Sequence, residues 1–221
     1  MNTGDLVATA DIPGGGQLYL MQSGQDFEIV FEGEQLMGSW CHGSERALAT
    51  LAYAEIGDRG GEVLVGGLGM GFTLAAALEV MPEQAKITVA ELVPDIVAWA
   101  RGPLAHIHGT SLDDPRVTLE VRDVHDLIAE REERFDAILL DVDNGPDGLI
   151  QLANERLYCS WGIRAARAAL KPGGVLAVWS AYGDPTFRSR LSEAGFDVSE
   201  AEFDEDPDNG PHTIWLAAKT D

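Results

Sequence analysis

The hydrophobic and polar positions along the chain change their pattern near residue 62. Before that point, two β-rich runs at residues 18–21 and 27–31 flank a group of turn residues, which predicts a β-hairpin. In residues 44–56 the apolar positions recur three and four apart, which predicts a helix. We interpret residues 1–42 as a small N-terminal lead-in of β-strands.

From residue 62 onward, short and nearly continuous apolar runs alternate with helical patterns. The expected strands are residues 62–65, 87–90, 117–121, 137–140, 175–179, 196–203 and 212–218. The expected helices are residues 72–80, 94–100, 124–130, 161–170 and 185–194, with a helix stop and tight turn at 171–174. This alternation is typical of a parallel sheet covered on both faces. For residues 43–221 we predict an α/β, doubly wound, Rossmann-like domain with a seven-stranded sheet that ends in a hairpin.

Composition and charge narrow the possible partners. The chain has 221 residues, 45% of them apolar, and 37 acidic against 15 basic residues give a net charge of −22. Because such a surface repels phosphate backbones and anionic membranes, we expect neither nucleic acid nor membrane as a partner. It attracts polycations such as polyamines, but acidic surfaces also simply confer solubility, and composition leaves both interpretations open. Two cysteines, no secretory signal and no apolar run of membrane-spanning length lead us to expect a cytoplasmic protein.

A glycine-rich loop follows the first strand of the predicted sheet. Residues 66–71 read GGLGMG and run directly into a helix. Glycines permit a tight turn and let a ligand approach the backbone closely. The spacing does not fit the Gly-x-Gly-x-x-Gly fingerprint, because Phe72 stands where the third glycine belongs. A nicotinamide-dependent oxidoreductase is therefore disfavoured.

Acidic residues end the next three parallel strands. Glu91 can accept hydrogen bonds from both ribose hydroxyls of a nucleoside, and Asp123 can accept one from an adenine amino group. Asp141 ends the following strand at the same edge of the sheet. Any one of these acids could instead cap the helix that follows it. A glycine loop together with three acids on successive strand ends indicates a nucleoside cofactor.

These motifs resemble a known family. Residues 63–74 (VLVGGLGMGFTL), the three acids and the turn at 171–174 are similar to the motif series of class I S-adenosylmethionine-dependent methyltransferases. The N-terminal strands and residues 42–45 (HGSE) resemble more closely the spermidine synthase, or polyamine aminopropyltransferase, branch of that fold. The resemblance implies S-adenosylmethionine or its decarboxylated form as the donor, an amine as the acceptor, and a homodimer.

The resemblance also implies roles for individual residues. The cofactor-binding residues are Gly67, Gly69 and Gly71 beside the tail, Glu91 at the ribose, and Asp123 and Val124 at the adenine. The catalytic residues are Asp141, which assists the attacking amine, and Asp143, while His42 and Glu45 shape the acceptor pocket. Carboxylates suit this chemistry because an amine is protonated in water and must lose a proton before it attacks.

Three positions depart from the family pattern and define the alternatives. Met70 replaces an acid that pairs with the donor's aminopropyl ammonium, Gly43 replaces a tyrosine, and the second acid of the acceptor loop is displaced to Asp143. Loss of the acid at residue 70 favours the alternative of a small-molecule methyltransferase that uses S-adenosylmethionine. A second alternative is a non-catalytic cofactor-binding module. His106 and His108 lack further ligands at zinc spacing, so we expect no metal.

Overall fold

The computed structural model describes residues 4–59, 61–142, 144–146, 154–204 and 210–220. The predicted catalytic residue Asp143 lies outside this part of the chain, as do residues 205–209 of the acidic loop before the last strand. None of the helices in the described ranges combines the length and the apolar character that crossing a membrane requires.

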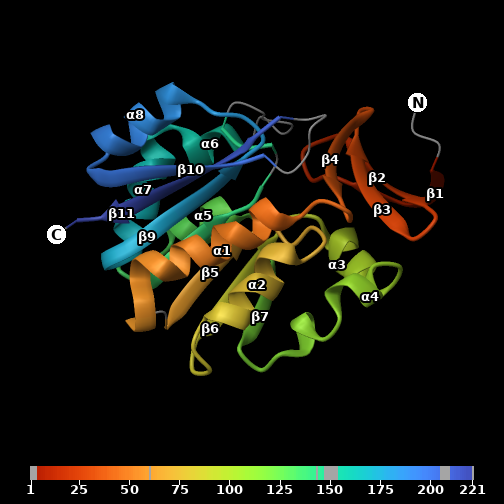
Figure 1. Ribbon diagram of the computed structural model, residues 1–221, viewed down its shortest axis with the longest axis horizontal. Coiled ribbons are helices and arrows are strands. Elements are labelled where there is room, and N and C mark those ends of the chain that lie inside the picture. Colours follow the sequence, from red (N-terminus) through yellow and green to blue (C-terminus); the bar gives the residue numbers. More distant parts are fainter. Residues whose placement is uncertain (1–3, 60, 143, 147–153, 205–209, 221) are drawn as a thin grey trace.

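A four-stranded antiparallel sheet opens the chain at the end of the molecule far from the C-terminus (Figure 1). Its strands, in spatial order, are β1 (Asp5–Asp11), β2 (Gln17–Ser23), β3 (Asp26–Phe31) and β4 (Glu34–Gly38). The predicted hairpin is confirmed as β2 and β3, in which Leu20 pairs with Ile29. The prediction missed β1 and β4, because few of their side chains are buried and they lack a clear apolar alternation.

The larger sheet has seven strands in the order β10-β11-β9-β8-β5-β6-β7. The strands are β5 (Glu62–Gly66), β6 (Lys86–Glu91), β7 (Val117–Val121), β8 (Phe135–Leu140), β9 (Leu170–Ser180), β10 (Phe196–Phe203) and β11 (His212–Lys219). The first five of these are parallel, and β11 runs antiparallel to both β9 and β10. The predicted doubly wound sheet with a closing hairpin is therefore confirmed.

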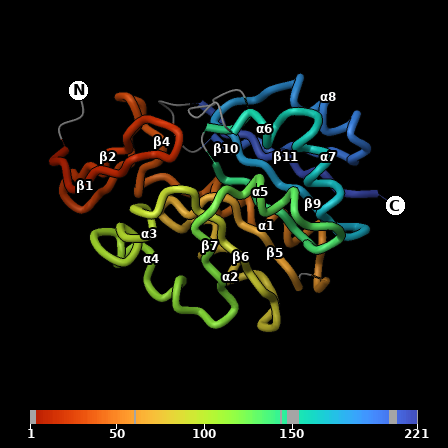
Figure 2. Tube along the Cα trace, turned by 180° about the vertical axis from the view of Figure 1, so that it is seen from behind, coloured from red at the N-terminus to blue at the C-terminus, as the bar shows by residue number. Residues whose placement is uncertain are grey.

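Helices cover both faces of this sheet. They are α1 (Gly43–Ile56), α2 (Phe72–Val80), α3 (Pro94–Arg101), α4 (Ala105–His108), α5 (Val124–Ala129), α6 (Glu155–Tyr158), α7 (Ser160–Ala169) and α8 (Pro185–Glu193). Val63 and Val65 of β5 belong to a core shared with α1 and α2, whereas Leu64 belongs to a core shared with α5, α7 and α8. Side chains alternate between the two cores because the period of a strand is two. Figure 1 views the face of α1 and α2, and Figure 2 views the molecule from behind.

The turn predicted at residues 171–174 lies inside the sheet. Strand β9 begins at Leu170, immediately after α7 ends, and includes these residues. Leu170 pairs with Phe135, and the register then shifts before Val175 pairs with Ala137. The extra residues form an irregularity in the strand, where Gly173 has a φ of 71° that favours glycine.

Candidate active site

The centre of the large sheet is a topological switch point. Strands β5 and β8 are parallel neighbours, yet the chain continues from β5 to β6 on one side and from β8 to β9 on the other. Loops that leave neighbouring strands in opposite directions open a crevice at the carboxyl ends of those strands. The glycine loop follows β5 and Asp141 follows β8, so the two predicted parts of the site meet there.

The glycine loop and Asp141 are in backbone contact. The Asp141 N–H group donates to the Gly66 carbonyl oxygen across 3.0 Å. Gly67 has a φ of +89°, and a Cβ atom at this residue would lie 2.2 Å from the Asp141 carbonyl oxygen. Residue 67 must therefore be glycine, both for its backbone conformation and for space.

A cavity at this edge gathers most of the predicted site residues. Those that line it are Glu45, Gly67, Gly69, Glu91, Asp123, Val124 and Asp141. Gly71 and His42 are not among its lining residues. Gly71 begins α2 against the buried ring of His108, which a Cβ atom would meet at 2.5 Å. His42 stacks on Phe72 with the ring centroids 4.2 Å apart.

Glu91 is a buried carboxylate held by the backbone. Its two oxygens accept hydrogen bonds from the N–H groups of Leu68 and Val93, each across 2.8 Å. Burial raises the pKa of Glu91, and these backbone hydrogen bonds offset part of the rise. Each carboxylate oxygen has a further lone pair. Glu91 is thus fixed in position and can still accept hydrogen bonds from the hydroxyl groups of a bound nucleoside.

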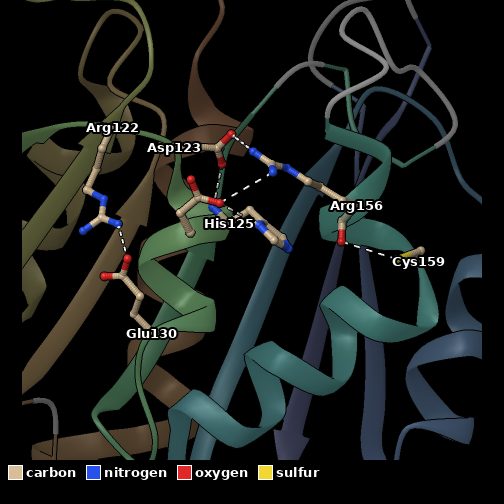
Figure 3. A network of polar contacts seen from close by, with 7 residues as sticks. Arg122, Asp123, His125, Glu130, Arg156 and Cys159 are labelled. Atoms are coloured by element: carbon tan, nitrogen blue, oxygen red, sulfur yellow. Dashed lines mark hydrogen bonds and ion pairs between the residues drawn. The ribbon is translucent and has the colours of Figure 1, made fainter.

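Asp123 both lines the cavity and caps a helix. One of its oxygens accepts from the His125 N–H group at the start of α5 across 2.8 Å, and the other pairs with Arg156 of α6 (Figure 3). The helix-capping alternative is therefore confirmed for this acid. Asp123, His125 and Asp126 have the residue types of a metal site. The Arg156 guanidinium also lies 3.5 Å from Asp126, so it already supplies a positive charge to both carboxylates.

Asp141 is enclosed by protein but partly open to the cavity. Its Oδ2 atom lies 2.6 Å from the Thr73 hydroxyl, which donates to the ionised carboxylate. Burial raises the pKa of Asp141 to about 6, and the Thr73 hydrogen bond lowers it. A carboxylate with a pKa in this range can take up and release a proton near neutral pH.

Glu45 belongs to a buried polar cluster at the start of α1. Its Oε2 atom accepts from the Ser44 hydroxyl across 2.8 Å. The same hydroxyl lies 3.0 Å from Nε1 of Trp179 on β9 and 2.8 Å from Nδ1 of His212 on β11. Trp179 also lines the cavity, so the cluster connects the cavity with the last strand of the sheet.

The N-terminal sheet and its flanking loops supply an apolar wall. The lining residues from this part of the chain are Ile12, Leu18, Ile29, Leu36 and Met37. The Met70 N–H group lies 3.2 Å from the Met37 sulfur, whereas the Met70 side chain is fully buried in the hydrophobic core and is not part of the lining. The side chain at residue 70 therefore faces away from the cavity.

Sequence reasoning missed Thr73, Ser44, Trp179 and His212. Trp179 had a detectable signal, because it ends an expected strand as the three acids do. Ser44 lies inside the motif at residues 42–45, but neither it nor Thr73 or His212 gives a local signal of its contacts: Thr73 and Asp141 are 68 residues apart, and Ser44 and His212 are 168 residues apart.

Comparisons with known proteins identify the family of the chain. A family model described as "Spermine/spermidine synthase domain" matches residues 46–192. The polyamine aminopropyltransferase of Nitrosomonas europaea is 34% identical over 135 residues, which cover 61% of this chain and 39% of the relative. That of Mycobacterium tuberculosis is 29% identical over 193 residues, which cover 83% of this chain and 35% of the relative. The chain therefore spans less than half the length of these curated relatives.

Solved structures share the fold. Spermidine synthase from Thermotoga maritima superposes with a TM-score of 0.74 at 18% identity, covering 97% of this chain and 72% of that one. A spermidine synthase in complex with the transition-state analogue AdoDATO superposes with a TM-score of 0.76 at 18% identity, covering 97% and 73%. The likeness extends through both sheets, including the N-terminal lead-in.

Proposed function

The chain belongs to the spermine/spermidine synthase family, and from this premise we propose that it transfers an aminopropyl group from decarboxylated S-adenosylmethionine to an amine acceptor. The observation that carries the proposal is the position of Asp141. It is a carboxylate with a pKa of about 6 that shares one cavity with the nucleoside-type residues Glu91 and Asp123. Such a group can remove a proton from an ammonium beside the donor.

The described residues fit the donor. Gly67 and Gly69 leave room for its tail, and Glu91 keeps lone pairs for the ribose hydroxyls. We assign Asp123 and Val124 to the adenine. When bound, the sulfonium of the donor supplies an electrophilic carbon. Asp141 then holds and deprotonates the attacking amine, with Thr73 orienting its carboxylate.

The second candidate is a methyltransferase that uses S-adenosylmethionine itself. The specific observation in its favour is Met70, whose buried side chain provides no carboxylate for an aminopropyl ammonium. Among the described residues, the apolar wall of Ile12, Leu18, Ile29, Leu36 and Met37 likewise offers no charge to pair with that ammonium.

The test supplies each donor separately to the purified protein with a panel of diamines and monoamines, and identifies the sulfur product by mass spectrometry. Methylthioadenosine that depends on the decarboxylated donor and an amine supports aminopropyl transfer. S-adenosylhomocysteine supports the methyltransferase instead. Donor binding by calorimetry without either product would favour the non-catalytic module. We further propose that the protein is a cytoplasmic homodimer, which sedimentation equilibrium and cell fractionation test.

A further inference from the structure

The Ser44 hydroxyl is a fully buried junction between three polar groups. It lies 3.0 Å from Trp179 Nε1, 2.8 Å from Glu45 Oε2 and 2.8 Å from His212 Nδ1. A serine hydroxyl has one hydrogen to donate and two lone pairs with which to accept. Its hydrogen-bonding capacity is therefore fully used by these three neighbours, and the position of its hydrogen depends on their protonation.

Two arrangements of hydrogens satisfy the junction. An indole N–H group can only donate, so Trp179 occupies one lone pair of Ser44 in both. When Glu45 is ionised, Ser44 donates to it and His212 donates from Nδ1. When Glu45 is protonated, Glu45 donates to Ser44, which donates to an unprotonated Nδ1 of His212. The two arrangements differ by the net movement of one proton from Glu45 to His212.

We propose that Glu45, Ser44 and His212 form a proton relay that carries a proton from the cavity toward the surface. Such a relay needs one end at the cavity and the other end near solvent. Glu45 is buried and lines the cavity, whereas His212 is partly exposed at the start of β11. The His212 ring is held in place by an edge contact with Trp179, whose ring centroid lies 4.9 Å away.

The relay rests on the proposed function, which releases one proton per turnover. An ammonium acceptor loses a proton, its freed lone pair forms the new C–N bond, and the electrons of the broken S–C bond stay on sulfur. Asp141 and Glu45 line the cavity together, and the Glu45 end of the relay offers this proton an exit through Ser44 to His212. The imidazolium then gives its Nε2 proton to solvent, and the junction resets when the ring returns to the tautomer in which Nδ1 is unprotonated.

The elements packed against His212 present both ionisable and non-ionisable groups at this end of the sheet. On α1, Glu45 is joined to His212 through the Ser44 hydroxyl, and β9 contributes Trp179, which does not titrate in this range. On β10 the directly opposite residue is Phe203, so Glu202, beside it, points to the other face of the sheet. Asp204 follows at the exposed end of that strand.

The first test measures this coupling without catalysis. Nitrogen-15 NMR of the His212 ring is followed against pH in the wild type, Glu45→Gln and Ser44→Ala. We expect the pKa of His212 to fall in Glu45→Gln, because the charge that favours the imidazolium is lost, and to change in Ser44→Ala. An identical His212 titration in all three proteins would overturn the relay. This readout stands even if the wild type forms no methylthioadenosine, an outcome that would count against the proposed function alone.

The second test measures the relay in turnover. In His212→Ala, kcat should fall by about 10- to 100-fold with KM for the donor unchanged, because proton release becomes slow. Added imidazoles of similar size should restore kcat in the order of their basicity. If they only filled the space left by the His212 ring, their basicity would not matter. The matched control is His106→Asn, an exposed histidine outside the cavity that should leave kcat unchanged. Restoration that ignores basicity, or an unchanged kcat in His212→Ala, contradicts the relay.

Discussion

Thr73 and Asp141 can keep their hydrogen bond whether the carboxyl group of Asp141 is ionised or protonated. The Thr73 hydroxyl lies 2.6 Å from Asp141 Oδ2 and 3.2 Å from the backbone carbonyl oxygen of Glu45. It donates to Asp141 when the carboxylate is ionised. When Asp141 is protonated, Asp141 can donate to Thr73, which then donates to the Glu45 carbonyl. A base held in this way can change its charge without leaving a buried polar group unpaired.

The pH dependence of activity should report Asp141. A general base must be ionised to act, so kcat/KM should rise with pH through about 6 in the wild type. Thr73→Val removes the hydrogen bond that favours the carboxylate, so the pKa of Asp141 rises further and the acid limb moves to higher pH. Steady-state kinetics over pH 4.5 to about 8 measures this shift. Thr73→Ser is the matched control, because it keeps the hydroxyl and should leave the limb in place.

Replacement of Asp141 should separate activity from stability. Asp141→Asn should lower kcat by about 10²- to 10⁴-fold, because it removes the base. The folded state raises the pKa of Asp141 from 3.8 to about 6, so between these values the folded protein binds more protons than the unfolded chain. Asp141 therefore favours the folded state most at low pH, where it is protonated, and this contribution to the free energy of unfolding is lost as pH rises through about 6.

Urea unfolding at two pH values tests the stability part. The free energy of unfolding of Asp141→Asn, relative to that of the wild type, should increase by on the order of 1–2 kcal/mol between pH 4 and pH 7. This figure is smaller than the full pKa shift would give, because the cavity exposes part of the carboxylate to solvent. A stability difference that stays constant with pH would show that Asp141 has no raised pKa in the folded protein.

Glu91→Gln should weaken binding of the nucleoside part of the donor. A glutamine side chain has one acceptor oxygen, so it cannot accept from both Leu68 and Val93 and also serve the ribose hydroxyls. Hydrogen bonds to charged groups contribute about 1.5–3 kcal/mol each, so the donor Kd should rise by roughly 10- to 100-fold. Isothermal titration calorimetry measures it, with exposed Glu55→Gln as the control. An unchanged Kd for Glu91→Gln would remove this residue from the donor site.

The sequence predicted the parts of the site that follow from strand order. Glu91 is the last residue of β6, and Asp123 and Asp141 follow the ends of β7 and β8 within two residues. Parallel strands bring their carboxyl ends to one edge of the sheet. The periodicity of the apolar positions identified these strands, and this was enough to predict that the three acids lie at the same edge of the sheet. At residues 171–174 the predicted helix stop is confirmed, because α7 ends at Ala169, but the sequence did not show that an irregular pairing keeps these turn-like residues inside β9.

What the sequence could not show are contacts set by packing between distant elements. Ser44 meets His212 because α1 packs against β9 and β11, and no local pattern at either residue signals this. Met37 reaches the glycine loop because the N-terminal sheet shares a core with α3 and the large sheet. Nor does a glycine-rich motif indicate to which side the side chain of Met70 will point.

The burial of Met70 predicts what happens when the family's acid is placed at this residue. In Met70→Asp the carboxylate would lie in the hydrophobic core without a partner, so we expect a loss of about 3–5 kcal/mol of stability and no gain for the decarboxylated donor. Met70→Leu conserves volume and should cost less than about 1.5 kcal/mol. Urea unfolding and the ratio of kcat/KM for the two donors measure both effects. If Met70→Asp folds normally and shifts the ratio toward the decarboxylated donor, the side chain at residue 70 reaches the cavity, and this backbone position would then control the choice of donor.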